Sequence, residues 1–140
     1  MEAVEADRKG DYAGDGMKEL FEADLASGED FNNLFESHLK STVEEELADA
    51  CIRLFDYAGL IDRDLDDFDY ENSDTDDYSE MIFTEAMYNI TSYVMELNIS
   101  EILNEIFAFC KDRKIDIFWY IEQKMRYNKQ RPYKHGNKKY

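Results

Sequence analysis

The sequence predicts an all-α fold, and three observations lead to that prediction. Only one proline and six glycines occur among 140 residues, which disfavours turn-rich sandwiches and barrels. No segment alternates polar and apolar residues as a half-buried strand does. Apolar residues instead recur at helical spacing, and hydrophobic residues make up 44% of the chain, enough for a core. We therefore expect one domain over residues 1–140, built as a helical bundle.

The first helix is expected over residues 1–9, ended by Gly10 and a glycine-rich turn that contains Gly14 and Gly16. It begins without a capping residue, which leads us to expect further sequence upstream of Met1. A weaker, irregular stretch covers residues 17–25.

The second strong helix is expected to begin at about residue 31 or 41 and to run to residue 57, ending at Gly59. Ser41 and Thr42 are both candidate caps, and Thr42 with Glu45 has the spacing of a capping box. Within this stretch Val43, Leu47, Ala50, Leu54 and Ala58 share one helical face, with Cys51 at its edge. This apolar stripe predicts a core position for the helix.

The third helix is expected to be long, over residues 79–111. Its apolar residues wrap so widely that it should pack on more than one side or lie in a subunit interface. Residues 98–100 are a candidate break, after which Ser100 would cap a new start at Glu101. The fourth helix is expected over residues 115–128 and is stopped by Arg131 and Pro132.

Charge is unevenly distributed along the chain. Thirty-three acids and 16 bases give a net charge of -17, which argues against nucleic-acid and anionic-membrane partners. Residues 62–80 hold ten acids and one base, and we expect a solvated acidic loop there. An EF-hand is excluded in this loop because it lacks the central glycine. No apolar run reaches the roughly 18 residues of a membrane span and no signal peptide is present, so we expect a cytoplasmic protein.

Several kinds of site are excluded by residue type and spacing. Cys51 and Cys110 both lie in apolar helical surroundings, so neither a disulfide scaffold nor a thiolate zinc site is expected. His38 and His135 do not follow a glutamate at one-turn spacing, which excludes a di-iron bundle. Phosphate-binding glycine loops and serine nucleophile elbows are absent as well.

Two acidic pairs are candidate metal ligands. Glu46 and Asp49 are three residues apart and therefore neighbours on one side of a helix, with Arg53 beside them. Glu2 and Glu5 form a second pair with the same spacing. Carboxylates so placed repel each other, and Mg²⁺, Mn²⁺ or Ca²⁺ would reverse that repulsion. An ordinary solvated acidic face is the alternative, and the spacing alone leaves both open.

The C-terminal segment, residues 124–140, holds seven bases and no acid. Lys124 and Asn128 are four residues apart on one helical face, and Arg131 follows where the helix ends. Lysine, arginine and asparagine can together hold phosphate groups. The alternative is that residues 129–140 form a basic tail, which either neutralises the acidic body or binds nucleic acid without specificity.

The strings EEELADACIRLFDYAG (residues 44–59) and KMRYNKQRPYKHG (residues 124–136) resemble the MazG-like, all-α nucleoside triphosphate pyrophosphohydrolases. The family signature pairs E-x-x-E on one helix with E-x-x-D on a later helix. Glu46 and Asp49 fit the second half, with Glu45 as the extra acid before it. The opening string EAVEADRKGD is similar to the end of the first half, with Glu2 as its last glutamate and Glu5 as a neighbour.

The resemblance implies a four-helix type of bundle with an acidic loop insertion, which assembles as a homodimer or homotetramer. It implies a Mg²⁺-dependent enzyme, with Mn²⁺ as the alternative ion, that splits a (d)NTP into the monophosphate and pyrophosphate in nucleotide-pool house-cleaning. The metal ligands would be Glu2, Glu46 and Asp49, with Glu5 as a further candidate, and Glu45 would accept a proton from the attacking water. The phosphate-binding residues would be Lys124, Asn128, Arg131, Lys134 and Arg53.

Two other interpretations stay open. A catalytically silent helical module would keep the fold and bind nucleotides or a protein partner. A DNA mimic would use the net charge, although the basic segment interrupts the acidic surface that mimics need. Tyr127 and Tyr133 are candidates to stack on a nucleobase, and the alternative for both is packing in the protein interior.

Overall fold

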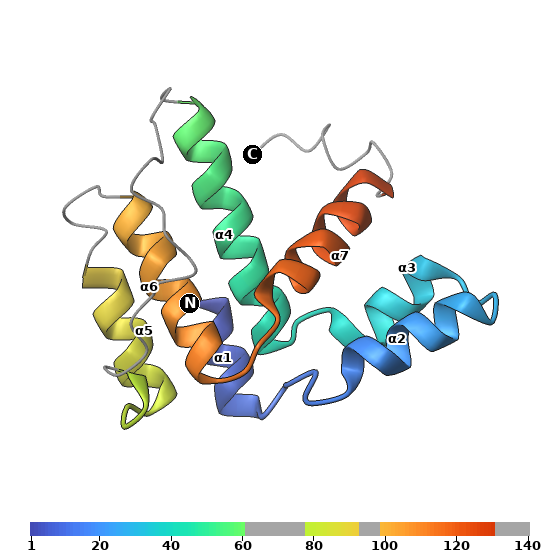
Figure 1. Cartoon of the computed structure of the whole chain (residues 1–140), viewed down its shortest axis with the longest axis horizontal. Coiled ribbons are helices and arrows are strands. Elements are labelled where there is room, and N and C mark those ends of the chain that lie inside the picture. The colour runs from blue at the N-terminus through green and yellow to red at the C-terminus, as the bar shows by residue number, and fades with distance from the viewer. Residues whose placement is uncertain (61–77, 93–98, 131–140) are drawn as a thin grey trace.

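The computed structural model describes residues 1–60, 78–92 and 99–130. Within this part every regular element is a helix, so the prediction of an all-α chain is confirmed (Figure 1). None of the described helices combines the length and apolar character needed to span a bilayer. The elements in chain order are α1 (Glu2–Lys9), α2 (Met17–Ala26), α3 (Phe31–Leu34), the π-helical turn η1 (Phe35–Leu39), α4 (Val43–Leu60), α5 (Phe83–Ser92), α6 (Ile99–Asp112) and α7 (Ile117–Gln130).

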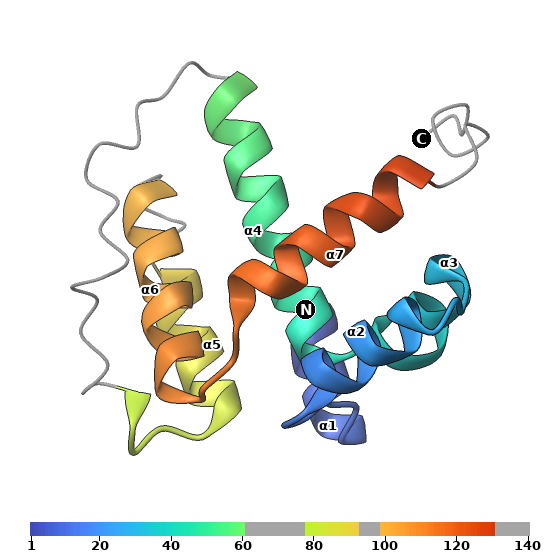
Figure 2. The ribbon, with the colours of Figure 1, turned by 45° about the vertical axis from the view of Figure 1, so that its right-hand side comes forward.

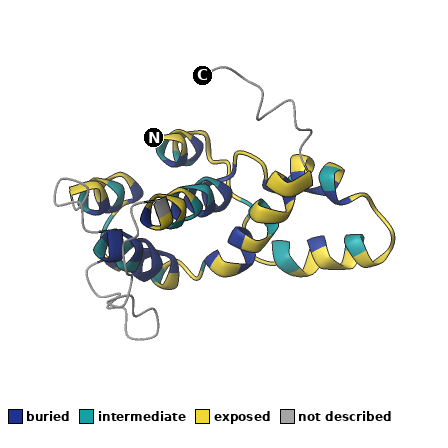
Figure 3. Ribbon diagram, turned by 90° about the horizontal axis from the view of Figure 1, so that it is seen from above, coloured by how far each residue is buried: buried dark blue, intermediate teal, exposed yellow. Residues whose placement is uncertain are grey.

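Helix α4 is the element around which the others are arranged (Figures 1 and 2). It contacts α1, α6 and α7, while α5 packs on α1 and α6, and α3 contacts both α2 and α7. The predicted apolar stripe of α4 faces inward, since Val43, Leu47 and Ala58 are buried. Seen from above, most helices carry one buried side and one exposed side, as amphipathic helices do (Figure 3).

The start of α4 agrees with one of the two predicted boundaries. The Thr42 hydroxyl accepts a hydrogen bond from the Glu45 amide at 3.2 Å, which is the predicted cap. Residues 31–39 form the separate elements α3 and η1, and Ser41 then adopts a left-handed φ of 64° that breaks the chain direction. The predicted end at Gly59 is wrong, because α4 continues through Gly59 to Leu60.

The prediction of one continuous helix over residues 79–111 is wrong. The described residues form two helices, α5 and α6, which pack against each other. Helix α6 begins at Ile99, so Ser100 lies inside it and is buried, and its predicted capping role is wrong as well. The candidate break at residues 98–100 agrees with the structure, because α6 begins at Ile99. Apolar periodicity alone is the same in one long helix and in two shorter ones.

The predicted acidic loop falls mostly on residues 61–77, which lie outside the described residues. Its last part is described, and there Tyr78 is completely buried rather than solvated. The Tyr78 hydroxyl donates to a carboxylate oxygen of Glu105 and accepts from the Asn89 side chain at 3.2 Å. Tyr78 therefore ties the end of the acidic segment to α5 and α6.

Both cysteines are buried and unpaired, as predicted. Burial raises the pKa of the Cys51 thiol to about 12. A thiol with such a pKa is protonated at neutral pH and behaves as a small apolar side chain.

An aromatic cluster holds α7 against α3 and η1. Phe35 is fully buried and stacks on Tyr127, with ring centroids 4.2 Å apart. The Tyr127 hydroxyl donates to Glu36 at 2.9 Å. Tyr127 is therefore a packing residue in this structure, the alternative left open by the sequence.

We expect Phe35→Ala to lower the free energy of unfolding by about 3–5 kcal/mol, because it empties a closed core position. Tyr88→Ala removes a comparable ring from α5 that is 80% exposed, and should change stability by less than about 0.5 kcal/mol. Urea denaturation followed by circular dichroism measures both. Equal losses in the two variants would contradict the described packing of η1 on α7.

Candidate functional site

Acidic and basic side chains from α1, α4 and α7 meet on one side of α4. Glu2, Glu46, Asp49 and Arg53 line a cavity of about 620 Å³. Lys124 of α7 does not line this cavity, but its ammonium binds Glu45 and lies 3.8 Å from Asp49. This arrangement brings together most of the site residues predicted from the sequence. We refer to the group as the carboxylate site, which consists of Glu2, Glu45, Glu46, Asp49, Arg53 and Lys124.

Glu45 is almost completely buried and has partners on both carboxylate oxygens. One oxygen accepts a hydrogen bond from the Ser41 amide at 3.0 Å, and the other is bound by the Lys124 ammonium. A buried carboxylate is stable only when it is paired in this way. Glu45 therefore positions the start of α4 and Lys124, and its role as a proton acceptor stays a prediction.

Lys124 is the cation that compensates the buried acids. Its side chain is 13% exposed, and its ammonium binds Glu45 and lies 3.8 Å from an Asp49 oxygen. The rings of Phe35 and Tyr127 both have their centroids 5.9 Å from the ammonium. The aromatic cluster described above thus forms part of the wall around this cation.

Asp49 lies between two cations. The Arg53 guanidinium donates to one of its oxygens at 2.6 Å, and Lys124 approaches the other. The Arg53 side chain is itself largely exposed, so this pair is at the rim of the site. Arg53 is therefore free to change rotamer at little cost.

Glu46 differs from its neighbours because its carboxylate has no hydrogen-bond or ion-pair partner within the described part of the chain. Burial raises the pKa of Glu46 above the ordinary 4.5, and the nearby Glu45 raises it further, while Lys124 opposes the shift. Glu2 and Asp49 add smaller contributions in the same direction as Glu45. The negative charge around Glu46 is therefore only partly compensated.

The cavity beside these acids also has many apolar lining residues. Helices α4, α5 and α6 supply Leu54, Met87 and Ile106 to its wall. Tyr57 and Tyr88 also line it, with 47% and 80% of their surface exposed. The cavity thus combines charged and apolar lining residues, as is common in small-molecule pockets.

The remaining predicted site residues are not in this group. Glu5 pairs with Lys9 at 2.8 Å on the exposed face of α1 and does not line the cavity. Asn128 is exposed on α7, one turn beyond Lys124, and does not line it either. Arg131 and Lys134 lie outside the described residues.

Carboxylate oxygens are the ligands that Mg²⁺ prefers, so the donor type at this site fits the predicted ion. Among the residues that the structure describes, however, no three acidic, histidine or cysteine side chains are grouped closely enough to hold a metal ion. Lys124 meanwhile neutralises Glu45 and Asp49. Side-chain movement in this acidic group would therefore have to accompany metal binding.

Sequence reasoning missed two kinds of functional residue. Glu44 received no role from the sequence, yet it is buried and accepts hydrogen bonds from the Ala13 and Gly14 amides at 2.9 and 3.1 Å. The cavity wall from α5 was missed because it depends on how α5 folds back on α6. Nothing in the local pattern of α5 indicates that contact.

Comparison with known proteins finds no match for this chain, whether among protein-family models, curated proteins or solved structures.

We expect Lys124→Met to lower the free energy of unfolding by about 3 kcal/mol, because it leaves the buried Glu45 carboxylate without its counter-ion. Adding Glu45→Gln, which keeps an acceptor for the Ser41 amide and removes the charge, should recover part of the loss. Lys129→Met, a matched change at an exposed position of α7, should have little effect. A thermodynamic cycle from urea denaturation measures the coupling, and additive effects would contradict the buried pair.

We expect Glu46→Gln to stabilise the protein at pH 7. A carboxyl whose pKa is raised on folding binds its proton more tightly in the folded chain, so its contribution to stability falls as pH rises through 4.5 and above. The glutamine variant should therefore have a higher urea midpoint at pH 7 and lose this advantage as the pH falls below 4.5. Glu85→Gln, an exposed control on α5 with the same charge change, should show no comparable pH-dependent gain.

Proposed function

We propose that this protein is a Mg²⁺-dependent nucleoside triphosphate pyrophosphohydrolase that converts a (d)NTP and water into the (d)NMP and pyrophosphate. One observation carries the proposal: Glu2, Glu46 and Asp49 of the predicted signature line a single cavity although they come from two helices. The resemblance implies that these three residues are ligands of one metal site. Their common cavity supports that assignment.

In the proposed mechanism, Glu2, Glu46 and Asp49 hold Mg²⁺, or Mn²⁺ as the alternative. Bound there, such an ion would supply charge neutralisation for the phosphates and a lowered pKa for a coordinated water. The incomplete compensation of Glu46 supports this role, since an additional cation would relieve the repulsion among these acids. Arg53, exposed at the rim and bound to Asp49, orients that carboxylate and is available to a phosphate group.

Lys124 would bind the polyphosphate after exchanging partners. Its ammonium binds Glu45 and Asp49 in the described structure, and a phosphate oxygen offers the same kind of charged acceptor. Asn128 follows one turn later on α7, and we assign it, with Arg131 and Lys134, to the leaving pyrophosphate. Stabilising that group matters because its negative charge grows in the transition state.

The apolar lining residues of the cavity would contact the sugar and the base. The whole cavity has a volume of about 620 Å³, within the usual range for small-molecule pockets. Tyr57 and Tyr88 present exposed rings at its edge, where a base can stack.

We further propose that α1, α4, α6 and α7 correspond to the four-helix core of MazG-like proteins, since α4 contacts the other three. A cytoplasmic homodimer or homotetramer would fit this assignment.

A catalytically silent nucleotide-binding module is the second candidate. It is favoured by the pairing of Lys124 with Glu45 and Asp49, which satisfies these acids without any metal ion. Such a module would bind a nucleotide through Lys124 and the apolar cavity but would not turn it over.

We expect the full chain to release pyrophosphate from at least one (d)NTP in the presence of Mg²⁺. Asp49→Asn should reduce the rate at least about 100-fold, because it weakens both metal binding and the orientation of Arg53. Asp56→Asn, on the exposed side of the same helix and outside the cavity, is the matched control and should keep full activity.

Calorimetry with a non-hydrolysable dNTP analogue separates the two candidates. Magnesium-dependent binding without pyrophosphate release would support the silent module. Absence of both binding and release would overturn the carboxylate site as a nucleotide site. Equal activity in Asp49→Asn and Asp56→Asn would overturn the proposed role of Asp49.

A further inference from the structure

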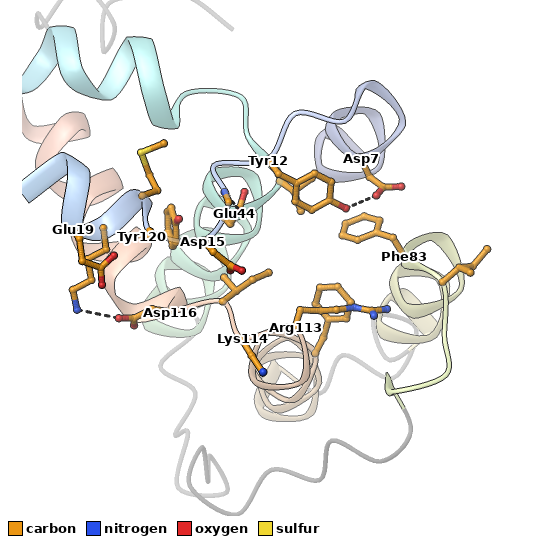
Figure 4. Close-up of a pocket in the computed structure, with 18 of the residues that line it drawn as sticks. Asp7, Tyr12, Asp15, Glu19, Glu44, Phe83, Arg113, Lys114, Asp116 and Tyr120 are labelled. Carbon is orange, nitrogen blue, oxygen red and sulfur yellow. Dashed lines mark hydrogen bonds and ion pairs between the residues drawn. The ribbon is translucent and has the colours of Figure 1, made fainter.

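A second cavity, of about 840 Å³, shares no lining residue with the carboxylate site. It lies between the end of α6, the turn before α5, the loop over residues 10–16 and the first turns of α2, α4 and α7 (Figure 4). We refer to it as the interhelical cavity. The proposed nucleotide chemistry makes no use of it.

The loop that forms one wall of this cavity is held by Glu44. Both carboxylate oxygens of Glu44 accept backbone hydrogen bonds, from the Ala13 and Gly14 amides. The Val43 amide adds a hydrogen bond to the Asp11 carbonyl at 2.9 Å. These three bonds attach the loop to the first turn of α4, so this wall is preformed.

Four aromatic residues contribute to the cavity wall. They are Tyr12, Phe83 and Tyr120, which are labelled in Figure 4, and Phe109. Phe83 and Phe109 meet edge to face, with centroids 5.5 Å apart. The negative faces of such rings attract a cation that is carried on an apolar body.

Acidic side chains outnumber basic ones around the same space, and most of the bases are already paired. Lys18 binds Asp116 at 3.2 Å, and Arg113 donates to the Met81 carbonyl and lies over the Phe109 ring. The lining acids are Asp7, Asp15, Glu19, Glu44 and Asp116, against the bases Lys18, Arg113 and Lys114.

Two of these acids are available to a ligand. Asp15 and Glu19 have no side-chain hydrogen bond or ion pair within the described residues, and Asp15 is directed toward the open centre of the cavity (Figure 4). Burial raises the pKa of Tyr120, and four carboxylates, those of Glu44, Asp116, Glu19 and Asp15, raise it further. These four carboxylates therefore lie around the same part of the cavity. The net charge of -17 of the whole chain adds to the attraction for cations.

We propose that the interhelical cavity binds a small organic ammonium ion with an aromatic body. The ring of such a ligand packs among Tyr12, Phe83 and Tyr120, and its ammonium group lies toward Asp15 and Glu19. Lys114 is the one lining base that has no partner among the described residues, and it is exposed. The lining acids outnumber the bases, so a cationic ligand would meet more opposite charges in the cavity than an anionic ligand would.

The test compares three ligands of nearly the same shape and different charge: phenethylamine, 2-phenylethanol and phenylacetate. Titration of the ¹⁵N-labelled full chain, followed by amide chemical shifts, should show the amine binding at least about fivefold more tightly than the alcohol, with phenylacetate weakest. The shifts should be largest for residues 12–16 and Tyr120. Tighter binding of phenylacetate, or equal binding of all three, would overturn the proposal.

Variants test whether Asp15 and Glu19 cause the preference for the amine. Asp15→Asn should weaken amine binding about threefold and leave alcohol binding unchanged, and the double variant with Glu19→Gln should remove the preference for the amine. Asp24→Asn, on the same helix as Glu19 but outside the cavity, is the matched control and should bind like the wild type. An amine preference that survives the double variant would place binding elsewhere and overturn the proposal.

Discussion

The buried pair between Lys124 and Glu45 is the interaction on which the rest of the arrangement depends. The two residues are 79 positions apart, and the pair links α7 to the first turn of α4. Two charges taken out of water must be matched closely, so the pair allows little freedom in how α7 crosses α4. The stack of Phe35 on Tyr127 lies beside it and excludes water from the same place. The pair therefore helps to fix where α7 lies beside the acidic residues of α4.

The three glutamates in the first turn of α4 have separate tasks. A helix N-terminus favours acids there, which explains why three can be tolerated in succession. Because successive residues point in different directions, Glu44 binds the loop over residues 10–16, Glu45 binds Lys124 and Glu46 lines the 620 Å³ cavity. The first turn of α4 therefore contributes residues to both cavities, although the two cavities have no lining residue in common.

The two cavities differ in how their charge is balanced. At the carboxylate site, Lys124 and Arg53 offset the charge of Glu45 and Asp49, and Glu46 is left with a raised pKa. In the interhelical cavity, most bases are paired with an acid or with a backbone carbonyl, whereas Asp15 and Glu19 have no ion-pair partner among the described residues. Unpaired charge is costly at the partly buried Glu46, whereas Asp15 and Glu19 are exposed and solvated.

The sequence by itself determined the features that depend on neighbours along the chain. These include the helical class, the end of α1 at Gly10, the cap at Thr42 and the common side of Glu46 and Asp49, all of which follow from spacing within one or two turns. Only the tertiary structure decided that α5 packs on α6, that Tyr78 is buried and that Lys124 pairs with Glu45. Those outcomes depend on contacts between segments that are far apart in sequence. Burial and charge pairing determine the free energy of these contacts, and neither can be read from the spacing of residues within one segment.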